Sequence, residues 1–153
     1  LKHDSSLFFH GYTYSGHPAC CAAALKNIEI LKRDKILEHV REIEPYFFEK
    51  LNTLYELPIV GDIRGKGLMA GIECVINKSS KEALILDKAI GSRIDEESIK
   101  LGLIIRPLYH ICVLSPALII TKSQIDDLTE KLYLAISNTI DQLQKEGLWS
   151  NQK

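Results

Sequence analysis

The chain has 153 residues, of which 46% are hydrophobic and 25% charged, values typical of a soluble globular protein that buries its core in one domain. Its formal net charge of −1 gives no electrostatic reason to expect a nucleic acid or an anionic membrane as partner. No apolar run is long enough to span a bilayer and no signal-peptide pattern opens the chain, so we expect a cytoplasmic protein.

An aromatic, hydroxyl-rich loop, residues 8–18, precedes the first predicted helix. This helix runs from about Pro18 to Arg33 and carries Cys21, Leu25 and Ile28 on one stripe. Pro18 suits the first turn of a helix, where its missing N–H costs nothing. The loop therefore brings hydroxyls and free N–H groups to a helix start, where an anion is favoured. Packing of an aromatic-rich loop is the alternative, and geometry alone favours it.

Neither the cysteines nor the histidines suggest a metal site. Cys20, Cys21, Cys74 and Cys112 form no C-x-x-C pair and have no histidine at zinc-finger spacing. His10 and His17 lie seven residues apart with no third ligand. We therefore expect no metal, and four small buried thiols in a reducing cytoplasm.

Three further helices are predicted. The second helix follows a stripe interrupted by Pro45, which is expected to kink the helix or begin a new one. A third spans Leu84 to Leu101, weakened by Gly91, and the last is capped by Ser123 with Asp126 and followed by Gly147. The stripes of the second and last helices are Ile36, Val40, Ile43, Phe47, Leu51 and Leu54, and Ile125, Leu128, Leu132, Ile136, Ile140 and Leu143.

Short strands are predicted between these helices. Residues 57–76 form extended structure with a tight turn at Gly65 and Gly67. Three more strands follow at 103–105, 111–114 and 118–120. The alternation of strands and helices indicates an α/β or α+β fold.

Three stretches resemble one protein family in the same order. His10-Gly11-Tyr12-Thr13-Tyr14-Ser15-Gly16-His17-Pro18 resembles the signature loop of class III, pyridoxal-phosphate-dependent aminotransferases, especially the omega-amino-acid group. The segments 60–69 (VGDIRGKGLM) and 102–108 (GLIIRPL) are similar to two later motifs of that family. The resemblance covers nearly the whole chain. It implies the C-terminal part of a homodimeric fold-type I enzyme, in which residues 1–30 end the large cofactor-binding domain and begin a connecting helix, and residues 31–153 form the small domain.

The resemblance also assigns roles to three residues. It implies that Thr13 hydrogen-bonds the phosphate of pyridoxal 5'-phosphate held by the other subunit, with Tyr12 as a weaker companion. The alternative for Thr13 is a loop threonine that caps local backbone. Arg106 is implied to bind the substrate carboxylate with its planar guanidinium, the alternative being a surface arginine at a strand end. Arg64 is expected to be structural.

The family resemblance places two essential groups outside this sequence. In such enzymes the Schiff-base lysine and the aspartate that pairs with the pyridine nitrogen lie upstream of the signature loop. We therefore expect the chain to be a fragment of a longer protein. It should contain no catalytic residue, and the chain alone should have no transaminase activity. Surfaces that normally pack on the large domain would be exposed, so aggregation is expected.

This chain departs from the family just after Arg106. Many relatives continue with glycine and an acidic residue, where Tyr109 and His110 stand here, and carry a second proline where Ala117 follows Pro116. A tyrosine in place of glycine is expected to distort the turn that aims Arg106.

The implied function is transfer of an amino group from an amine or omega-amino acid to a keto acid such as pyruvate. Alternatives are a biotin-pathway 8-amino-7-oxononanoate aminotransferase, a more distant semialdehyde aminomutase, and a non-catalytic remnant or interaction module.

Overall fold

The computed structural model describes residues 10–84 and 90–150. The internal contacts of the chain group it into two units, residues 1–37 and residues 38–153. None of the helices in the described ranges is long and apolar enough to cross a membrane.

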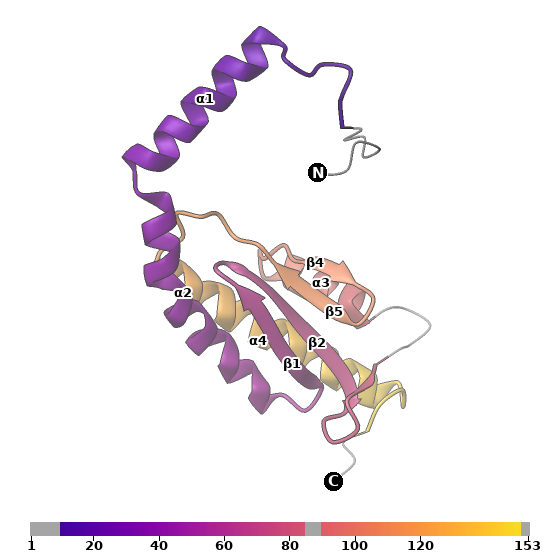
Figure 1. The fold of residues 1–153 in the computed structure, drawn as a ribbon. Helices are drawn as coiled ribbons and strands as arrows, with labels where there is room; N and C mark the ends of the chain where they lie inside the picture. The colour runs from indigo at the N-terminus through magenta and orange to yellow at the C-terminus, as the bar shows by residue number, and fades with distance from the viewer. Residues whose placement is uncertain (1–9, 85–89, 151–153) are drawn as a thin grey trace, which may run out of the picture. The chain divides into compact units, whose positions relative to one another are not determined.

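The first unit contains helix α1 (Pro18–Arg33), with the bounds predicted from the sequence (Figure 1). Lys32 and Arg33 in its last turn complement the helix dipole. The helix buries no residue, however, and Leu25 remains 69% exposed. Cys20 and Cys21 are also exposed, so the prediction of buried thiols is wrong for this pair. An apolar stripe needs a second apolar surface, and the described part of this unit supplies none.

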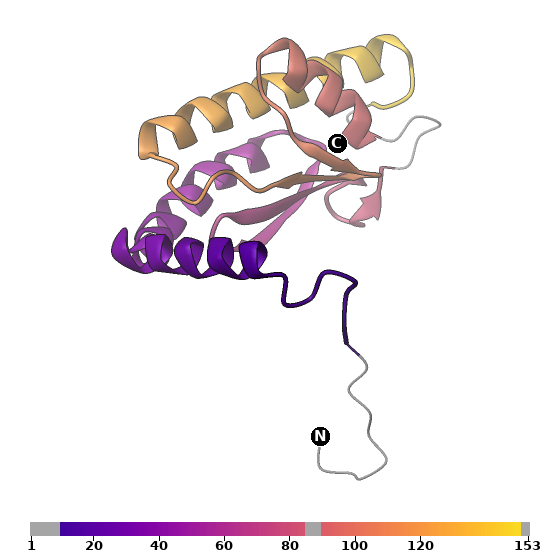
Figure 2. The same ribbon diagram turned by 90° about the horizontal axis from the view of Figure 1, so that it is seen from above.

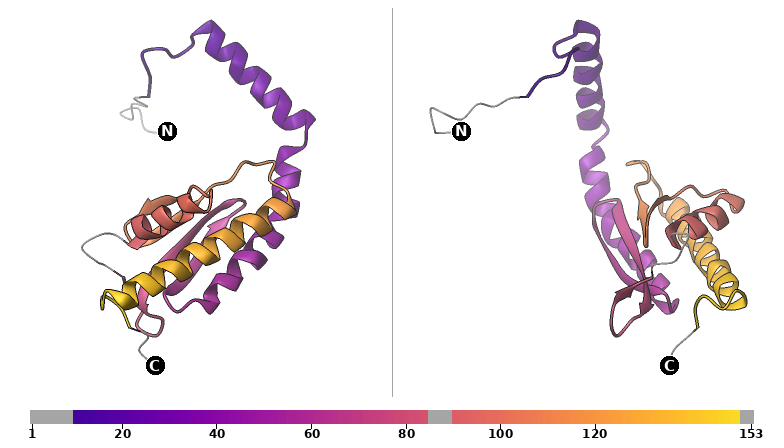
Figure 3. Two further views of the ribbon diagram at one scale, coloured as in Figure 1. Left: turned by 180° about the vertical axis from the view of Figure 1, so that it is seen from behind. Right: turned by 90° about the vertical axis from the view of Figure 1, so that its right-hand side faces the viewer.

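The second unit is built on an antiparallel sheet with strand order β1-β2-β5-β4 and a short fifth strand, β3, paired with β2. Helix α4 lies across one face of this sheet with α2 and α3 on either side of it (Figures 1 and 3). One hydrophobic core lies between the helices and the sheet. The elements are α2 (Ile36–Asn52), η1 (Thr53–Glu56), β1 (Val60–Lys66), β2 (Met69–Asn77), β3 (Glu82–Ala83), α3 (Ile90–Lys100), β4 (Arg106–Leu108), β5 (Ile111–Leu114) and α4 (Lys122–Lys145).

Strand register sorts the side chains of the sheet onto two faces. Ile72 pairs with Cys112, and both are fully buried against the helices. On the next row Arg64 pairs with Gly71, Gly71 with Val113, and Val113 with Arg106. Because side chains alternate between faces along a strand, this second row lies on the opposite, open face. The sheet therefore has one face in the core and one face without a helical cover, as Figure 2 also shows for residues 38–153.

Helix α2 continues through Pro45, so of the two expected outcomes the start of a new helix is wrong, and the kink stays a prediction. Pro45 is exposed, and the carbonyl that loses its N–H partner can therefore bind water. Ile43, Phe47 and Leu51 are buried on the other side of the helix and hold both halves against the core. Leu54, the last residue of the predicted stripe, is buried in the following turn η1.

Helix α3 begins later than predicted. Leu84 is extended and donates its N–H to the Cys74 carbonyl at 3.1 Å, so the chain here follows the sheet. Residues 85–89 of the predicted helix lie outside the described ranges, and α3 begins at Ile90. Its end is marked by Gly102, which has φ +76°, and by the Leu103 N–H, which binds the Ser98 carbonyl at 2.9 Å.

Two predicted strands are absent because other contacts use their backbones. Leu103–Ile105 belongs to the cap of α3, and strand β4 begins only at Arg106. Residues 118–120 form a turn in which the Ile120 N–H binds the Ala117 carbonyl at 3.0 Å. His39 Nε2 lies 3.0 Å from the Ile120 carbonyl, which fixes this turn against α2. The predicted strand at Ile111–Leu114 is confirmed as β5.

Helix α4 has the predicted buried stripe but a different cap. The Thr121 side chain accepts from the Gln124 N–H at 3.3 Å, and the Gln124 side chain accepts from the Thr121 N–H at 2.9 Å. The predicted pair of Ser123 and Asp126 is therefore wrong, because the chain enters the helix two residues earlier. At the other end Gly147 follows the helix with φ +69°, as predicted.

Candidate functional site

The loop before α1 forms two consecutive turns. The Tyr12 N–H donates to Ser15 Oγ at 2.9 Å, and the Ser15 N–H donates to the Tyr12 carbonyl at 3.0 Å. The His17 N–H then donates to the Tyr14 carbonyl at 3.2 Å, with Gly16 at φ +77°. These bonds close the loop on itself immediately before Pro18. The local backbone is thus capped by Ser15.

Thr13 lies at the outer bend of the first turn and is exposed. Within the described residues, its hydroxyl and the N–H groups of Thr13 and Tyr14 have no hydrogen-bond partner. Phosphate oxygens only accept hydrogen bonds, so one hydroxyl and adjacent N–H donors suit a phosphate group. Tyr12 contributes its ring, which is 74% exposed and packs edge-on to His10. The donor set fits the cofactor phosphate that the family resemblance implies.

Arg106 belongs to the other unit, residues 38–153, and opens strand β4 at the sheet edge. It stands at the beginning of a strand, where the sequence predicted the end of one. The residue is exposed, and across residues 10–84 and 90–150 its guanidinium makes no ion pair or hydrogen bond. An unpaired guanidinium on the open face of a sheet is available for a carboxylate.

An open hollow of about 590 Å³ lies on the same face of the sheet as Arg106. Val113, the cross-strand neighbour of Arg106, lies on its floor, and Gly71 leaves room because it has no side chain. The lining is mainly apolar, with two cations at the β1 side: Arg64, Gly65, Lys66, Met69, Ala70, Gly71, Leu108, Ile111 and Val113. Strand pairing therefore brings a free guanidinium beside an apolar surface.

Arg64, at the far side of this face, is neutralised by neighbouring carboxylates. Its guanidinium binds Glu73 and lies 2.8 Å from Asp62 Oδ2. The pKa of Arg64 is raised by Glu73 and then by Asp62, and the pKa of Asp62 is lowered mainly by Arg64. Glu73 Oε1 also lies 3.5 Å from His110 Nε2. These contacts fit a structural role for Arg64, and no sequence signal had linked it to His110.

The turn between β4 and β5 keeps its register despite Tyr109. Leu108 pairs with Ile111 without a register shift, while Tyr109 adopts φ +52°. Tyr109 thus adopts a left-handed φ while the strand pairing stays regular, and its effect on the aim of Arg106 stays a prediction. The Tyr109 carbonyl accepts the Gly91 N–H at 2.8 Å, which ties the turn to the first turn of α3.

The buried cysteines offer no nucleophile. Cys74 and Cys112 are fully buried free thiols in β2 and β5, as predicted for this pair. A hydrogen bond with Cys74, together with burial, raises the pKa of the Cys112 thiol well above its usual value. A thiol held protonated is a poor nucleophile and a poor metal ligand.

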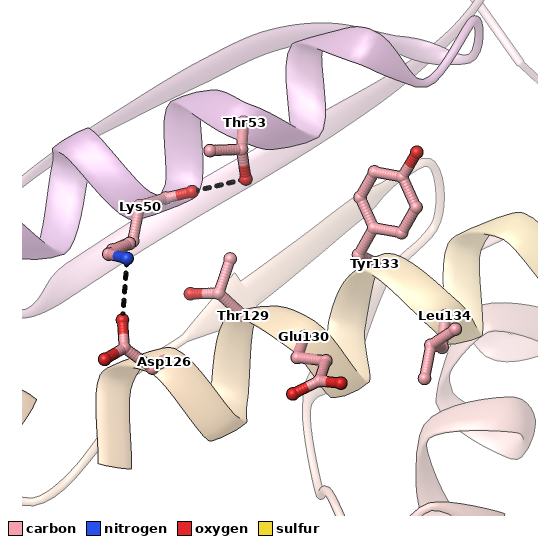
Figure 4. A pocket seen from close by; sticks show the side chains of 7 residues that line it. All are labelled: Lys50, Thr53, Asp126, Thr129, Glu130, Tyr133 and Leu134. Carbon is pink, nitrogen blue, oxygen red and sulfur yellow. Dashed lines mark hydrogen bonds and ion pairs between the residues drawn. The ribbon is translucent and has the colours of Figure 1, made fainter. Parts of the chain in front are cut away.

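A second hollow, of about 450 Å³, lies between α2 and α4 (Figure 4). Two of its charges are already paired: Lys50 Nζ lies 3.0 Å from Asp126 Oδ1, which also accepts the Tyr46 hydroxyl at 2.7 Å. The hydroxyls of Thr53 and Thr129 donate to helix carbonyls at 2.8 Å. Its remaining lining residues are Glu130, Tyr133 and Leu134. Because its lysine, aspartate and threonines are already used in contacts within the protein, this hollow is a weaker candidate than the Arg106 face.

A comparison with known protein families matches the part of the chain that carries Thr13 and Arg106. The family model described as "Aminotransferase class-III" matches residues 2–136, which include the Thr13 loop and the Arg106 strand. This chain belongs to the class III aminotransferases. The fold is accordingly part of a fold-type I transaminase.

Relatives and solved structures support the same assignment. Putrescine–pyruvate aminotransferase of Pseudomonas aeruginosa is 43% identical over 122 residues, which cover 79% of this chain and 26% of the relative. Adenosylmethionine-8-amino-7-oxononanoate aminotransferase of Methanocaldococcus jannaschii is 37% identical over 133 residues, covering 87% of this chain and 29% of the relative. The PMP-bound form of an aminotransferase from Vibrio fluvialis matches with a TM-score of 0.81 at 38% identity, over 88% of this chain and 30% of that chain. This class III chain thus spans just over a quarter of the length of the curated relatives it matches.

Proposed function

We propose that this chain is the C-terminal part of a pyridoxal-phosphate-dependent transaminase that moves an amino group from an amine or omega-amino acid to a keto acid such as pyruvate. The observation that carries the proposal is Arg106, an unpaired guanidinium among the described residues, exposed beside an apolar hollow on the open face of the sheet. A keto acid offers a carboxylate for that guanidinium and a small apolar body for the neighbouring surface.

Thr13 would hold the cofactor phosphate with its hydroxyl and the adjacent N–H groups, with Tyr12 beside it. A complete enzyme of this kind is a homodimer in which the loop of one subunit serves the cofactor of the other. The cofactor supplies an electron sink, while the protein supplies orientation and charge. The phosphate contact by Thr13 fixes position, because a phosphate takes no part in the bond changes of amino transfer.

Arg106 would bind and orient the acceptor. Two parallel N–H···O bonds fix a carboxylate in one plane, which places the neighbouring keto carbon in a defined position. This role predicts that Arg106 matters only for acceptors with a carboxylate.

The direct test is acceptor discrimination by the holoenzyme that contains this chain. Arg106→Ala should raise KM for pyruvate by about tenfold to a hundredfold, the loss of a charge-assisted hydrogen-bonded pair. KM for an aliphatic aldehyde, which has no carboxylate, should stay within about twofold. Arg64→Lys is the matched control on the same face. Equal changes for both acceptors in Arg106→Ala would refute the carboxylate role.

The chain by itself should be inactive, because none of its lysines lies in a segment matching the family's cofactor-lysine motif. Purified chain incubated with amine, pyruvate and cofactor should form no alanine above background. Alanine formation would contradict the proposal that the reactive lysine lies outside these residues. A reducing compartment such as the cytoplasm suits its four free thiols.

A second candidate is 8-amino-7-oxononanoate aminotransferase, favoured by the relative of that name from Methanocaldococcus jannaschii. Its acceptor is a long keto acid rather than pyruvate. Competition between putrescine, an omega-amino acid and adenosylmethionine as amino donors would separate the two. Preference for adenosylmethionine would support the second candidate.

A further inference from the structure

Strand β4, which carries Arg106, is only three residues long and lies at the edge of the sheet. Among the strands that the structure describes, its ladder partner is β5 alone. A strand this short is weakly fixed by pairing on one side. Its position must therefore depend on what packs against it from elsewhere.

The first turn of α3 supplies that contact through Gly91. The Gly91 N–H donates to the Tyr109 carbonyl at 2.8 Å, so the helix end holds the β4–β5 turn directly. Gly91 is buried at this contact. A first-turn helix N–H has no partner inside the helix, which leaves it free for this bond.

The approach is too close for any side chain at position 91. A Cβ there would lie 2.9 Å from the Tyr109 carbonyl oxygen, 3.3 Å from the Ile111 carbonyl oxygen and 3.3 Å from Pro107 Cβ. Two of these three atoms are backbone and the third belongs to a rigid ring, so none can move alone. Relief requires the whole hairpin to shift away from α3.

The turn that would absorb such a shift is already strained. Tyr109 holds φ +52°, a conformation that costs an ordinary L-residue free energy. A turn that is already strained has little freedom to take up a displacement of its carbonyl, so part of that displacement reaches strand β4. Pro107 lies next to Arg106, and its Cβ is one of the atoms that a Cβ at position 91 would meet.

We propose that Gly91 is a positioning residue for Arg106: its missing side chain and its N–H bond to Tyr109 set where the Arg106 guanidinium stands on the open face. The sequence had indicated only that Gly91 weakens a helix. This inference rests on the proposed carboxylate role of Arg106. It predicts that adding one carbon at position 91 changes carboxylate recognition without touching the substrate.

The test compares Gly91→Ala with Ser92→Ala in the holoenzyme. Ser92 is the next residue of α3, and its side chain makes no hydrogen bond with the described residues. Gly91→Ala should raise KM for pyruvate about fivefold to tenfold and leave KM for an aliphatic aldehyde within about twofold. Ser92→Ala should change neither. Equal KM changes for both acceptors in Gly91→Ala would overturn the proposal, since a merely structural defect would not distinguish them.

A double variant keeps the test decisive if Gly91→Ala folds poorly. Tyr109→Gly lets the turn relax, so Gly91→Ala/Tyr109→Gly should recover the melting temperature. Its KM for pyruvate should still exceed that of Tyr109→Gly alone, and a ratio of one would overturn the proposal.

The Arg106→Ala measurement separates the two levels of the argument. If Arg106→Ala does not distinguish pyruvate from the aldehyde, the proposed function of Arg106 fails. If Arg106→Ala distinguishes them and Gly91→Ala does not, only the positioning role fails. A crystal structure of the holoenzyme gives an activity-independent reading: Gly91→Ala should displace the backbone of Arg106 and Leu108, and Ser92→Ala should not.

Discussion

Tyr109 shows how one side chain can be strained without disturbing the strand pairing around it. The β4–β5 turn needs one residue in the left-handed region, and Tyr109 occupies it with φ +52° while 81% of its side chain is exposed. The exposed ring offers little packing to offset the backbone cost. The hydrogen bond from Gly91 and the regular pairing of Leu108 with Ile111 hold the turn in place.

Replacing Tyr109 with glycine should therefore stabilise the chain. Relief of left-handed strain is worth about 1–2 kcal/mol, and the extra freedom of glycine in the unfolded state removes about 0.5–1 kcal/mol of that. We expect the free energy of unfolding to rise by up to about 1.5 kcal/mol in urea denaturation. Ile104→Gly is the control, since Ile104 is 86% exposed and has no positive φ. If the Tyr109→Gly variant were less stable than the Ile104→Gly variant, the turn would not be strained.

Glu97 makes the free energy of unfolding depend on pH in the acid range. This carboxyl group is 7% exposed in α3, and its pKa is lowered by hydrogen bonds from Lys100 and then Gln142. A lowered folded-state pKa adds stability above the unfolded value of about 4.3, and this stability is lost as pH falls through the folded pKa.

Glu97→Gln should flatten the acid side of the stability curve. The wild-type free energy of unfolding should fall more steeply below about pH 4.3 than that of the variant, because only the wild type must take up a proton at Glu97. Urea denaturation across this pH range measures the slope, with exposed Glu130→Gln as control. If the curves of unfolding free energy against pH were parallel for all three proteins, Glu97 would not contribute to the loss of stability in acid.

At the scale of elements, the entry into α4 was misplaced by two residues for an identifiable reason. Thr121, Ser123 and Gln124 all belong to the residue types found at helix starts. Thr121 is selected because the turn at residues 117–120 ends there, fixed by His39 of α2. Asp126 turns instead to Tyr46 and Lys50 and joins α4 to α2.

Thr121→Ala should cost about 1 kcal/mol of stability, since it removes the side-chain acceptor of the Gln124 N–H. Ser123→Ala should change stability by less than about 0.5 kcal/mol, because Ser123 lies inside the helix and its side chain caps nothing among the described residues. Thermal unfolding of both variants measures the difference. A larger loss of stability in Ser123→Ala than in Thr121→Ala would indicate that Ser123 caps the helix, as predicted from the sequence.

At the scale of the whole molecule, the two units differ in how they are stabilised. Residues 38–153 contain a hydrophobic core between the sheet and three helices. Helix α1 buries no residue and exposes Leu25 and Ile28. Exposed apolar stripes of this kind promote self-association.

A chain that begins at Lys35 and keeps all of α2 should retain a cooperative unfolding transition. We expect its denaturant midpoint to match that of the full chain, because the residues removed contribute no buried side chain from α1. Self-association measured by light scattering should decrease with the loss of Leu25 and Ile28. A collapsed transition would mean that α1 stabilises the core. The boundary predicted between residues 30 and 31 stays a prediction.

The sequence by itself determined which segments become helices and what family they belong to. Apolar spacing of about 3.6 residues identified α1, α2 and α4, although only α2 and α4 bury their stripes among the described residues. The resemblance of the motifs around Thr13 and Arg106 to those of class III aminotransferases identified the family, which the family model over residues 2–136 confirms. The roles of Thr13, Tyr12 and Arg106 remain predictions.

Only the tertiary structure decided what depends on long-range contact. The pairing of β2 with β5, strands separated in sequence by α3, placed Arg106 and Val113 in one row with Gly71 and Arg64, and no turn in the sequence sets that pairing. From the sequence, Gly91 only weakens a helix. In the structure, the close approach of α3 to the β4–β5 turn leaves no room for a side chain at this position. Residues 103–105 and 118–120 looked like strands because they are apolar, yet their backbone groups are used by a helix cap and a turn. Apolar content did not decide their structure, since Ile104 and Ile119 remain exposed, whereas the hydrogen-bond partners of the backbone did.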